Sequence, residues 1–372
     1  MLSQELRARG FRVSLYNNRG LPGTYTSVPN TFVSACVRLL ATQHQIYLTS
    51  FCFSPALCLY LNHLLRGRPY VFNAVGLMSA LYRERAQRWP FPRLAEHRLY
   101  PTLMDRILRG ASHIVCNSEY LQKKLACQFP HYGHKMLTIY NGIECDRFAS
   151  GMPMAIEGIP PAAPKLLAVM TWDYEGKAMA ARLLIDAMEI VTAAAPAAHL
   201  IIAAKAGHAR YAQAIEAYLA TKPWRRSIRI LYNQTNVPDL LASSDLFVYA
   251  TPAESNDSLP RALLEAHAAG LPIVTTASAG CPEVVEHGVT GFVVPYDAGA
   301  LARHVLTLLD DPDTRRAWGG RGRERVHERF SWSRMGEAYA DLFRKMCANR
   351  LHSARATATS DHKTVGHSDG LL

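Results

Sequence analysis

Two acidic side chains and the start of an expected helix lie close together in the stretch 249–276. Asp257 precedes the helix, and Glu265 follows eight residues later, about two turns into it. An ionised carboxylate accepts hydrogen bonds through two oxygens, which suits the adjacent hydroxyls of a sugar. The helix start near Ser258 offers free N–H groups and the positive end of the helix dipole, which suit phosphate. These residues therefore indicate a ligand with hydroxyls on both sides of a diphosphate.

A structural interpretation of the same residues is also open. Asp257 can cap the helix. Glu265 can pair with Arg261, which lies four residues earlier on the same helix face. Spacing alone favours this interpretation over ligand binding.

The elements that must position these residues follow an alternating pattern along the chain. Strands are expected at 11–16, 45–50, 69–74, 113–118 and 136–140, and then at 165–171, 199–204, 227–232, 245–250, 272–276 and 291–295. Strands that alternate with helices indicate parallel sheets with helices on both faces. Residues 149–164 hold four prolines and one charged side chain, which is typical of a linker. We therefore expect an α/β protein of two doubly wound domains, with a ligand between them at the carboxyl ends of the strands.

Composition excludes several other classes of protein. The chain has 372 residues, of which 49% are hydrophobic and 19% charged, as in ordinary globular domains rather than disordered, collagen-like or coiled-coil chains. The eight cysteines include no Cys-x-x-Cys pair, which disfavours a disulfide scaffold or a zinc site and indicates a reducing, cytoplasmic compartment. Residues 1–12 contain no apolar segment of the kind found in secretory signals.

The surplus of positive over negative charge lies in the first part of the chain. Residues 1–150 hold 18 Lys and Arg against 7 Asp and Glu, whereas the remainder is balanced, so we expect the first domain to face something anionic. Within it, the stretch 81–100 interleaves five arginines with Trp89 and Phe91. This suits an anionic membrane surface or a lipid-phosphate acceptor, although a solvated basic face accounts for it equally well. No motif supports nucleic-acid binding.

Membrane insertion is tested by the uncharged run 46–61. It holds 16 residues, with two serines, a threonine and a proline among them. A membrane span needs about 20 predominantly apolar residues. A buried strand, a turn and a buried helix therefore fit the run better.

Four motifs in order resemble the family 4 (group 1) retaining glycosyltransferases, which have the GT-B fold. The family signature Glu-x7-Glu is matched by Asp257 and Glu265, followed by Gly270 and Pro272. The other matches are Asn141-Gly142-Ile143 before Phe148, Pro282-Glu283 before Gly291, and Phe330-Ser331-Trp332. The resemblance covers residues 100–347 well and residues 1–99 loosely.

The resemblance implies roles for the donor-side residues. Glu265 would bind the ribose hydroxyls of a nucleotide, and Asp257 would contact the transferred sugar. The shorter Asp257 keeps the charge but reaches less far than glutamate, and Glu254 could replace it if the loop is shifted. The main-chain N–H groups of Ser258 and Leu259 would lie near the donor phosphate and sugar.

The diphosphate site departs from the family pattern. The family places an arginine and a lysine after the first strand of the second domain. Lys177 matches the lysine, but Thr171 stands at the arginine position. Developing charge on a diphosphate must be met by cations or helix N-termini, and Arg261 or Arg182 could compensate. No metal is expected, and 311–313 (Asp-Pro-Asp) is interpreted as a turn.

The acceptor side departs further. The chain opens inside what looks like the first helix, 2–9, so the first strand and glycine-rich loop of the family are missing from it. Val75 stands where the family commonly has a histidine. Asn73 could supply a polar contact instead, and Gly76 follows it at the acceptor side.

These observations predict a GT-B enzyme of two Rossmann-like domains facing across a cleft. The N-terminal, acceptor-side domain spans 1–148, the linker 149–164 and the nucleotide-sugar-binding domain 165–330. A helix at 331–349 crosses back, and 350–372 is a disordered tail.

The expected reaction transfers a sugar from a nucleotide diphosphate sugar to a hydroxyl of a glycan or lipid-linked acceptor, with retention and without a metal or further cofactor. Its setting would be bacterial cell-surface polysaccharide or glycolipid assembly, in the cytoplasm or on the inner face of the cytoplasmic membrane. A non-catalytic relative that binds a nucleotide sugar or a protein partner is the alternative, and a start codon upstream of Met1 would restore the missing strand. A GT-B epimerase or phosphorylase fits the fold but not the Asp-x7-Glu setting.

Overall fold

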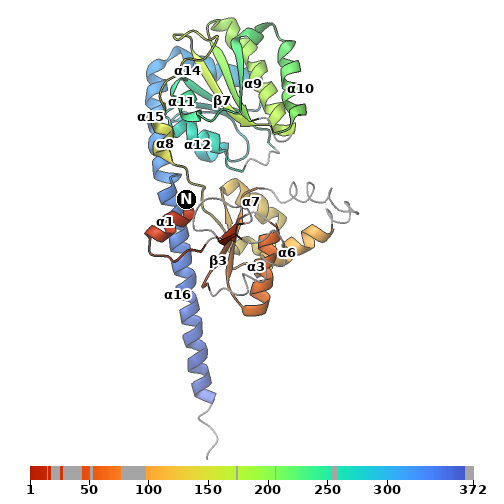
Figure 1. Cartoon of the computed structure of the whole chain (residues 1–372), viewed down its shortest axis with the longest axis vertical. Helices are drawn as coiled ribbons and strands as arrows, with labels where there is room; N and C mark the ends of the chain where they lie inside the picture. Colours follow the sequence, from red (N-terminus) through yellow and green to blue (C-terminus); the bar gives the residue numbers. More distant parts are fainter. Residues whose placement is uncertain are drawn as a thin grey trace, which may run out of the picture.

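The computed structural model contains two α/β units, each built on one parallel sheet (Figure 1). It describes residues 1–14, 16–17, 26–27, 44–50, 53–76, 98–172, 175–205, 207–253 and 258–364. The C-terminal unit lies at the top of Figure 1 and the N-terminal unit below it. A long helix begins near the place where the units meet and runs down beside the N-terminal unit and beyond it.

The N-terminal unit contains a sheet of four parallel strands in the order β3-β4-β5-β6. Its strands are β3 (Tyr47–Ser50), β4 (Tyr70–Ala74), β5 (His113–Cys116) and β6 (Met136–Thr138). The helices between them are α3 (Phe53–Arg66), α6 (Tyr100–Gly110) and α7 (Glu119–Gln128), and the 3-10 helix η2 (Pro130–Lys135) follows α7. The carboxyl ends of β4 and β5 point toward the C-terminal unit.

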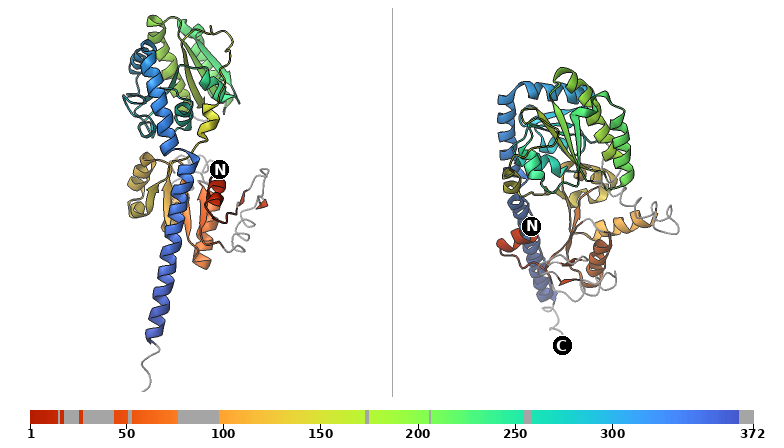
Figure 2. Two further views of the ribbon diagram at one scale, coloured as in Figure 1. Left: turned by 90° about the vertical axis from the view of Figure 1, so that its left-hand side faces the viewer. Right: turned by 45° about the horizontal axis from the view of Figure 1, so that its top comes forward.

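The two faces of this sheet are covered by different parts of the chain. Side chains from α3, α6 and α7 pack on one face around Phe72 and Ile114. The other face, which includes Val71 and Val115, packs against α1 (Leu2–Ala8) and α16 (Trp332–Thr364). Figure 2 shows α16 lying along this sheet. The last helix of the chain therefore completes the core of the first domain.

The C-terminal unit contains six parallel strands in the order β12-β11-β10-β7-β8-β9. They are β7 (Lys165–Thr171), β8 (His199–Lys205), β9 (Ile228–Tyr232), β10 (Leu246–Tyr249), β11 (Ile273–Thr276) and β12 (Gly291–Val294). The chain moves outward from β7 to β9 and then returns to the other side of β7. Ligands bind at such a switch point, outside the carboxyl ends of the strands.

Both faces of the six-stranded sheet are buried by helices, because its strands are apolar on both sides. One face packs against α9 (Glu175–Ala194), α10 (Ala209–Ala220) and α14 (Ala298–Asp310). The other packs against α8 (Cys145–Ala149), α11 (Val237–Ala242), α12 (Arg261–Ala268), α13 (Cys281–Val284) and α15 (Pro312–Arg329). The 3-10 helix η3 (Pro223–Ser227) precedes β9.

The two places where the chain passes between the units touch each other. Ile143 pairs with Ser331 in an isolated parallel bridge, and its N–H donates to the Phe330 carbonyl at 2.9 Å. A Cβ on Gly142 would lie 2.7 Å from the Ser331 carbonyl oxygen and from Trp332 Cα. Only glycine fits such a close backbone approach. The Asn-Gly-Ile and Phe-Ser-Trp motifs therefore form one joint between the domains.

The segment 149–164 is docked onto the C-terminal unit. The Met152 N–H donates to the Asp239 carboxylate at 2.9 Å, and the Met154 N–H donates to the Ser243 hydroxyl at 2.7 Å. Ile156 and Ile159 are buried in the core beneath α11 and α12. After α8 ends at Ala149 the segment contains no further helix or strand, but it is held in place along its length.

Two sequence-based expectations about local structure are wrong. Residues 11–14 form no strand; instead Phe11 packs edge-on against Phe343 of α16, with ring centroids 6.1 Å apart. A short β1 (Tyr16–Asn17) pairs with β2 (Thr26–Ser27) in a separate two-stranded sheet. Residues 350–364 continue α16 rather than forming a disordered tail, because extending a helix already fixed by packing costs less than starting one. Residues 365–372 lie outside the described residues.

Among the helices of the described residues, none is both long enough and apolar enough to cross a membrane.

Candidate functional site

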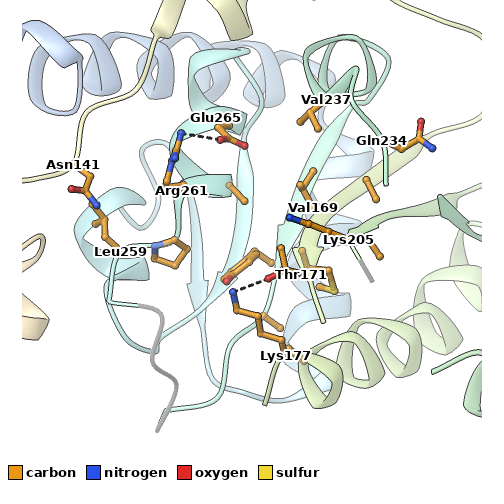
Figure 3. A pocket seen from close by; sticks show the side chains of 18 of the residues that line it. Asn141, Val169, Thr171, Lys177, Lys205, Gln234, Val237, Leu259, Arg261 and Glu265 are labelled. Carbon is orange, nitrogen blue, oxygen red and sulfur yellow. Dashed lines mark hydrogen bonds and ion pairs between the residues drawn. The ribbon is translucent and has the colours of Figure 1, made fainter. Parts of the chain in front are cut away.

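A cavity of about 630 Å³ lies where the carboxyl ends of β7, β8 and β10 face the N-terminal unit (Figure 3). It coincides with the switch point of the six-stranded sheet, between β7 and β10. Most of its lining comes from the C-terminal unit, and Val75, Asn117 and Asn141 close it from the other side. This volume is within the range of small-molecule sites.

Three cations enter the cavity from different elements. Lys177, in the first turns of α9, places its Nζ 3.2 Å from the Thr171 hydroxyl at the end of β7. Lys205 ends β8 in register with Thr171, so both side chains leave the same face of the sheet. Arg261 begins α12. This arrangement can neutralise a diphosphate at the ends of the strands, where charge-assisted hydrogen bonds are strong.

Glu265 supplies the carboxylate of the cavity. One of its oxygens lies 3.8 Å from Arg261 Nη2, and only 18% of its side chain is exposed. Burial raises the pKa of Glu265, while Arg261 and Arg147 act in the opposite direction. Figure 3 shows the Arg261–Glu265 pair on one side of the cavity and the Thr171–Lys177 pair on the other. A desolvated carboxylate in a cavity is typical of a functional site, so the ion pair and a ligand role coexist.

Helix α12 begins slightly later than the expected start near Ser258. Its N-cap is Pro260, two residues after Ser258, and its first residue is Arg261. The Ser258 hydroxyl instead reaches across the cleft, 3.0 Å from the Val75 carbonyl and 2.8 Å from the Asn117 amide oxygen. Both Ser258 and Leu259 are buried and line the cavity. The start of α12 is therefore fixed by the opposite domain.

The remaining site candidates fall into three groups. Asp257 and its alternative Glu254 lie outside the described residues, as does most of the basic stretch 81–100. Arg182 does not line the cavity and stacks over the Tyr218 ring, 4.9 Å from its centroid. Asn73 pairs along β4 with Ser50 and Val115, and neither it nor Gly76 lines the cavity; their neighbour Val75 does.

The sequence did not identify every residue that lines the cavity, and it located some of them only approximately. The loop 233–235, which follows β9, also lines the cavity. Lys205 was missed because the expected strand ends one residue earlier, at 204; its place opposite Thr171 is a consequence of sheet register. Asn117 and Asn141 follow strands of the other domain. Their polar side chains at the ends of those strands were the sequence feature that could have identified them as lining residues.

Acidic residues do not gather into a metal site in the part of the chain that the structure describes. Asp311 caps α15, where its carboxylate accepts from the Thr314 N–H at 2.9 Å. Residues 311–313 therefore cap and begin α15 rather than forming a separate turn. The absence of a metal from the reaction stays a prediction.

Two sequence families match the two halves of the chain. Residues 1–147 match the family described as Glycosyltransferase Family 4, and residues 163–311 match the one described as Glycosyl transferases group 1. The boundary between the matches lies in the docked segment that joins the two sheets.

Individual proteins show the same likeness. The N-acetyl-alpha-D-glucosaminyl L-malate synthase of Bacillus anthracis is 36% identical over 118 residues, which cover 31% of this chain and 30% of that enzyme. The match thus spans less than a third of the relative's length. A Rickettsia africae glycosyltransferase structure superposes with a TM-score of 0.74 at 16% identity, covering 94% of this chain and 93% of that one. Anabaena HepE in complex with UDP superposes with 0.67 at 19% identity, covering 83% and 82%. At these identities the structures establish the fold alone.

Proposed function

Because the chain belongs to the group 1 glycosyltransferases of family 4 and has their GT-B fold, we propose that it transfers a sugar from a nucleotide diphosphate sugar to an acceptor hydroxyl. The observation that carries the proposal is the interdomain cavity, which places the Glu265 carboxylate and three cations at the carboxyl edge of one sheet. A nucleotide sugar has hydroxyls at both ends and a dianionic diphosphate between them. The cavity offers a carboxylate for the hydroxyls and cations for the diphosphate.

Each residue has a role in this proposal. Glu265 accepts hydrogen bonds from the ribose hydroxyls, and Lys177 and Lys205 hold the diphosphate. Thr171 stands where the family has an arginine. Lys205 supplies the positive charge of that arginine, since Lys205 and Thr171 are neighbours in sheet register. Asp257, on the loop between β10 and α12, holds the transferred sugar.

The leaving diphosphate gains charge as the sugar bond breaks. Fixed cations beside it stabilise the transition state more than the ground state, which is what raises kcat. With retention of configuration and no metal, the acceptor hydroxyl attacks on the face that the diphosphate leaves, and a phosphate oxygen takes the hydroxyl proton. The acceptor is a growing glycan or a lipid-linked sugar of a bacterial cell surface, and it enters from the side of the N-terminal unit.

Nucleotide binding is the direct test. Thermal unfolding is measured with UDP, GDP and ADP, each beside its nucleoside. One diphosphate at 100 times its dissociation constant should stabilise the protein by about 2.7 kcal/mol, a rise in melting temperature of several degrees. If no nucleotide shifts the transition of the folded protein, the donor assignment is wrong and a non-catalytic relative is the better interpretation.

We also propose attachment to the inner face of the cytoplasmic membrane. The positive charge surplus of residues 1–150 supports it, since each basic side chain near an anionic surface adds about 1 kcal/mol of attraction. We expect the protein to sediment with phosphatidylglycerol vesicles at low salt and to be released at high salt. Equal sedimentation with neutral phosphatidylcholine vesicles would remove the proposal.

A further inference from the structure

The first turn of α7 in the N-terminal unit is closed by a carboxylate from the other domain. The N–H groups of Glu119 and Tyr120 donate to the two oxygens of Glu283 at 2.8 and 2.7 Å. The next N–H, of Leu121, donates to the Ser118 hydroxyl at 3.1 Å. The first N–H groups of a helix have no partner within it, and a carboxylate at this end also meets the positive end of the helix dipole. Glu283 therefore contacts the other domain at the start of α7, where free N–H groups and the helix dipole favour a negative charge.

Glu283 is rigidly mounted in the C-terminal unit. It lies in the short helix α13, whose backbone is held by Arg325 of α15. Arg325 donates to the carbonyls of Val284 at 3.0 Å and of Glu283 itself at 3.2 Å, and it pairs with Glu286 at 2.9 Å. The position of the Glu283 backbone is thus independent of the N-terminal unit.

The same short segment of the N-terminal unit, 117–120, also contacts both ends of the donor loop. Asn117 meets the Ser258 hydroxyl at 2.8 Å, and the Tyr120 hydroxyl donates to the Ala253 carbonyl at 3.3 Å. Ala253 and Ser258 flank the loop that carries Asp257. Gly280, the N-cap of α13, packs against Ser258 as well, because a Cβ on Gly280 would lie 2.0 Å from the Ser258 carbonyl oxygen. Ser258, α13 and the start of α7 therefore form one contact region.

We propose that Glu283 is a positioning residue that holds the two domains closed across the cavity by binding the first turn of α7. Its carboxylate acts beside the Ser258–Asn117 contact and sets the distance between α13 and the acceptor-side domain. The position of Ser258 at the cavity and the closure of the domains are coupled, because both depend on contacts with 117–120. As this role concerns the proposed donor site, it rests on the proposed function.

Hydrogen exchange measures the contact directly. The amides of Glu119 and Tyr120 would exchange freely in an open molecule, since no helical carbonyl protects them. In the full chain with Glu283→Ala we expect their exchange to accelerate about 10- to 100-fold, the range for losing a hydrogen bond to a charged acceptor. Glu283→Gln, which keeps one acceptor oxygen, should give an intermediate rate. Glu286→Gln is the matched control, because its carboxylate lies just beyond the end of α13 and pairs with Arg325 inside its own domain.

Shape and kinetics separate this role from simple stability. Small-angle scattering should show a larger radius of gyration for Glu283→Ala than for the wild type and the Glu286→Gln control. The dissociation constant for the stabilising nucleoside diphosphate should change less than about threefold, since the cations and Glu265 belong to the C-terminal unit, whereas kcat should fall about tenfold or more. Unchanged exchange and scattering would overturn the proposal. If no nucleotide binds even the wild type, the proposed function fails, yet exchange and scattering still decide the role of Glu283.

Discussion

Replacing Lys177 by methionine is expected to lower kcat about 10²- to 10³-fold, the effect of removing one fixed donor from a developing negative charge. Lys177 is held in place by its 3.2 Å contact with the Thr171 hydroxyl, so little reorganisation is needed when the diphosphate leaves. Methionine keeps the length and apolar stem of lysine and removes only the charge. The measurement is steady-state transfer with the donor identified by the nucleotide test.

The companion variants sharpen this result. Lys205→Met should have a smaller effect, because Lys205 is exposed and water screens its charge. Together the two changes should cost more than either alone. Lys345→Met, at an exposed position on α16 outside the cavity, is the matched control and should leave kcat unchanged. A Lys177→Met enzyme with kcat within twofold of the wild type would contradict the diphosphate role.

Substituting Glu265 should weaken nucleoside diphosphate binding about 10- to 100-fold, which is what losing hydrogen bonds to a charged acceptor costs. Glu265→Gln keeps the shape of the side chain and one acceptor oxygen, so it tests the charge, and Glu265→Ala removes the group. Binding is measured by calorimetry with the stabilising diphosphate. Glu189→Gln, at an exposed position on α9, is the matched control. Wild-type affinity in both Glu265 variants would exclude the ribose role.

Glu265→Gln should also stabilise the ligand-free protein against unfolding. Because burial raises the pKa of Glu265 above its ordinary value of 4.5, the folded state binds this proton more tightly than the unfolded state does. Stability contributed by Glu265 is therefore lost as pH rises through the raised pKa. Glu265→Gln, which never ionises, should melt above the wild type at pH 7, and the difference should shrink as pH falls below about 4.5. Thermal unfolding from pH 4 to pH 8 measures both trends.

Most of the fold follows from local sequence. Strand β7 is predicted with its bounds, 165–171, because a short, largely apolar run between turn residues is typical of a strand buried on both faces. The short β1 and the unpaired residues 11–14 could not be predicted in the same way. Phe11 and Val13 alternate as in a strand, but their half-buried apolar side chains belong to the core that α16 forms, more than 300 residues away in the sequence. Such a long-range contact leaves no mark on local periodicity.

The site was predictable in its residue types and less so in its geometry. The spacing of Lys177 and Glu265 places each on a helix next to a strand end, and both reach the cavity. Spacing could not show that Ser258 contacts the opposite domain or that Lys205 stands beside Thr171, since these depend on domain closure and sheet register. Glu283 was visible as part of a motif, but no side-chain pattern reveals that it binds the main-chain N–H groups of Glu119 and Tyr120.

The packing of α16 against the first sheet has a consequence for biosynthesis. Residues 47–138 leave the ribosome long before Tyr339 and Phe343, which cover one face of their sheet. At 5–20 residues per second the uncovered face waits for roughly 10–40 s. The C-terminal domain, whose core is complete by Phe330, can finish folding first. The nascent chain thus inverts the usual order, and the exposed face of the N-terminal sheet is where a ribosome-associated chaperone would be needed.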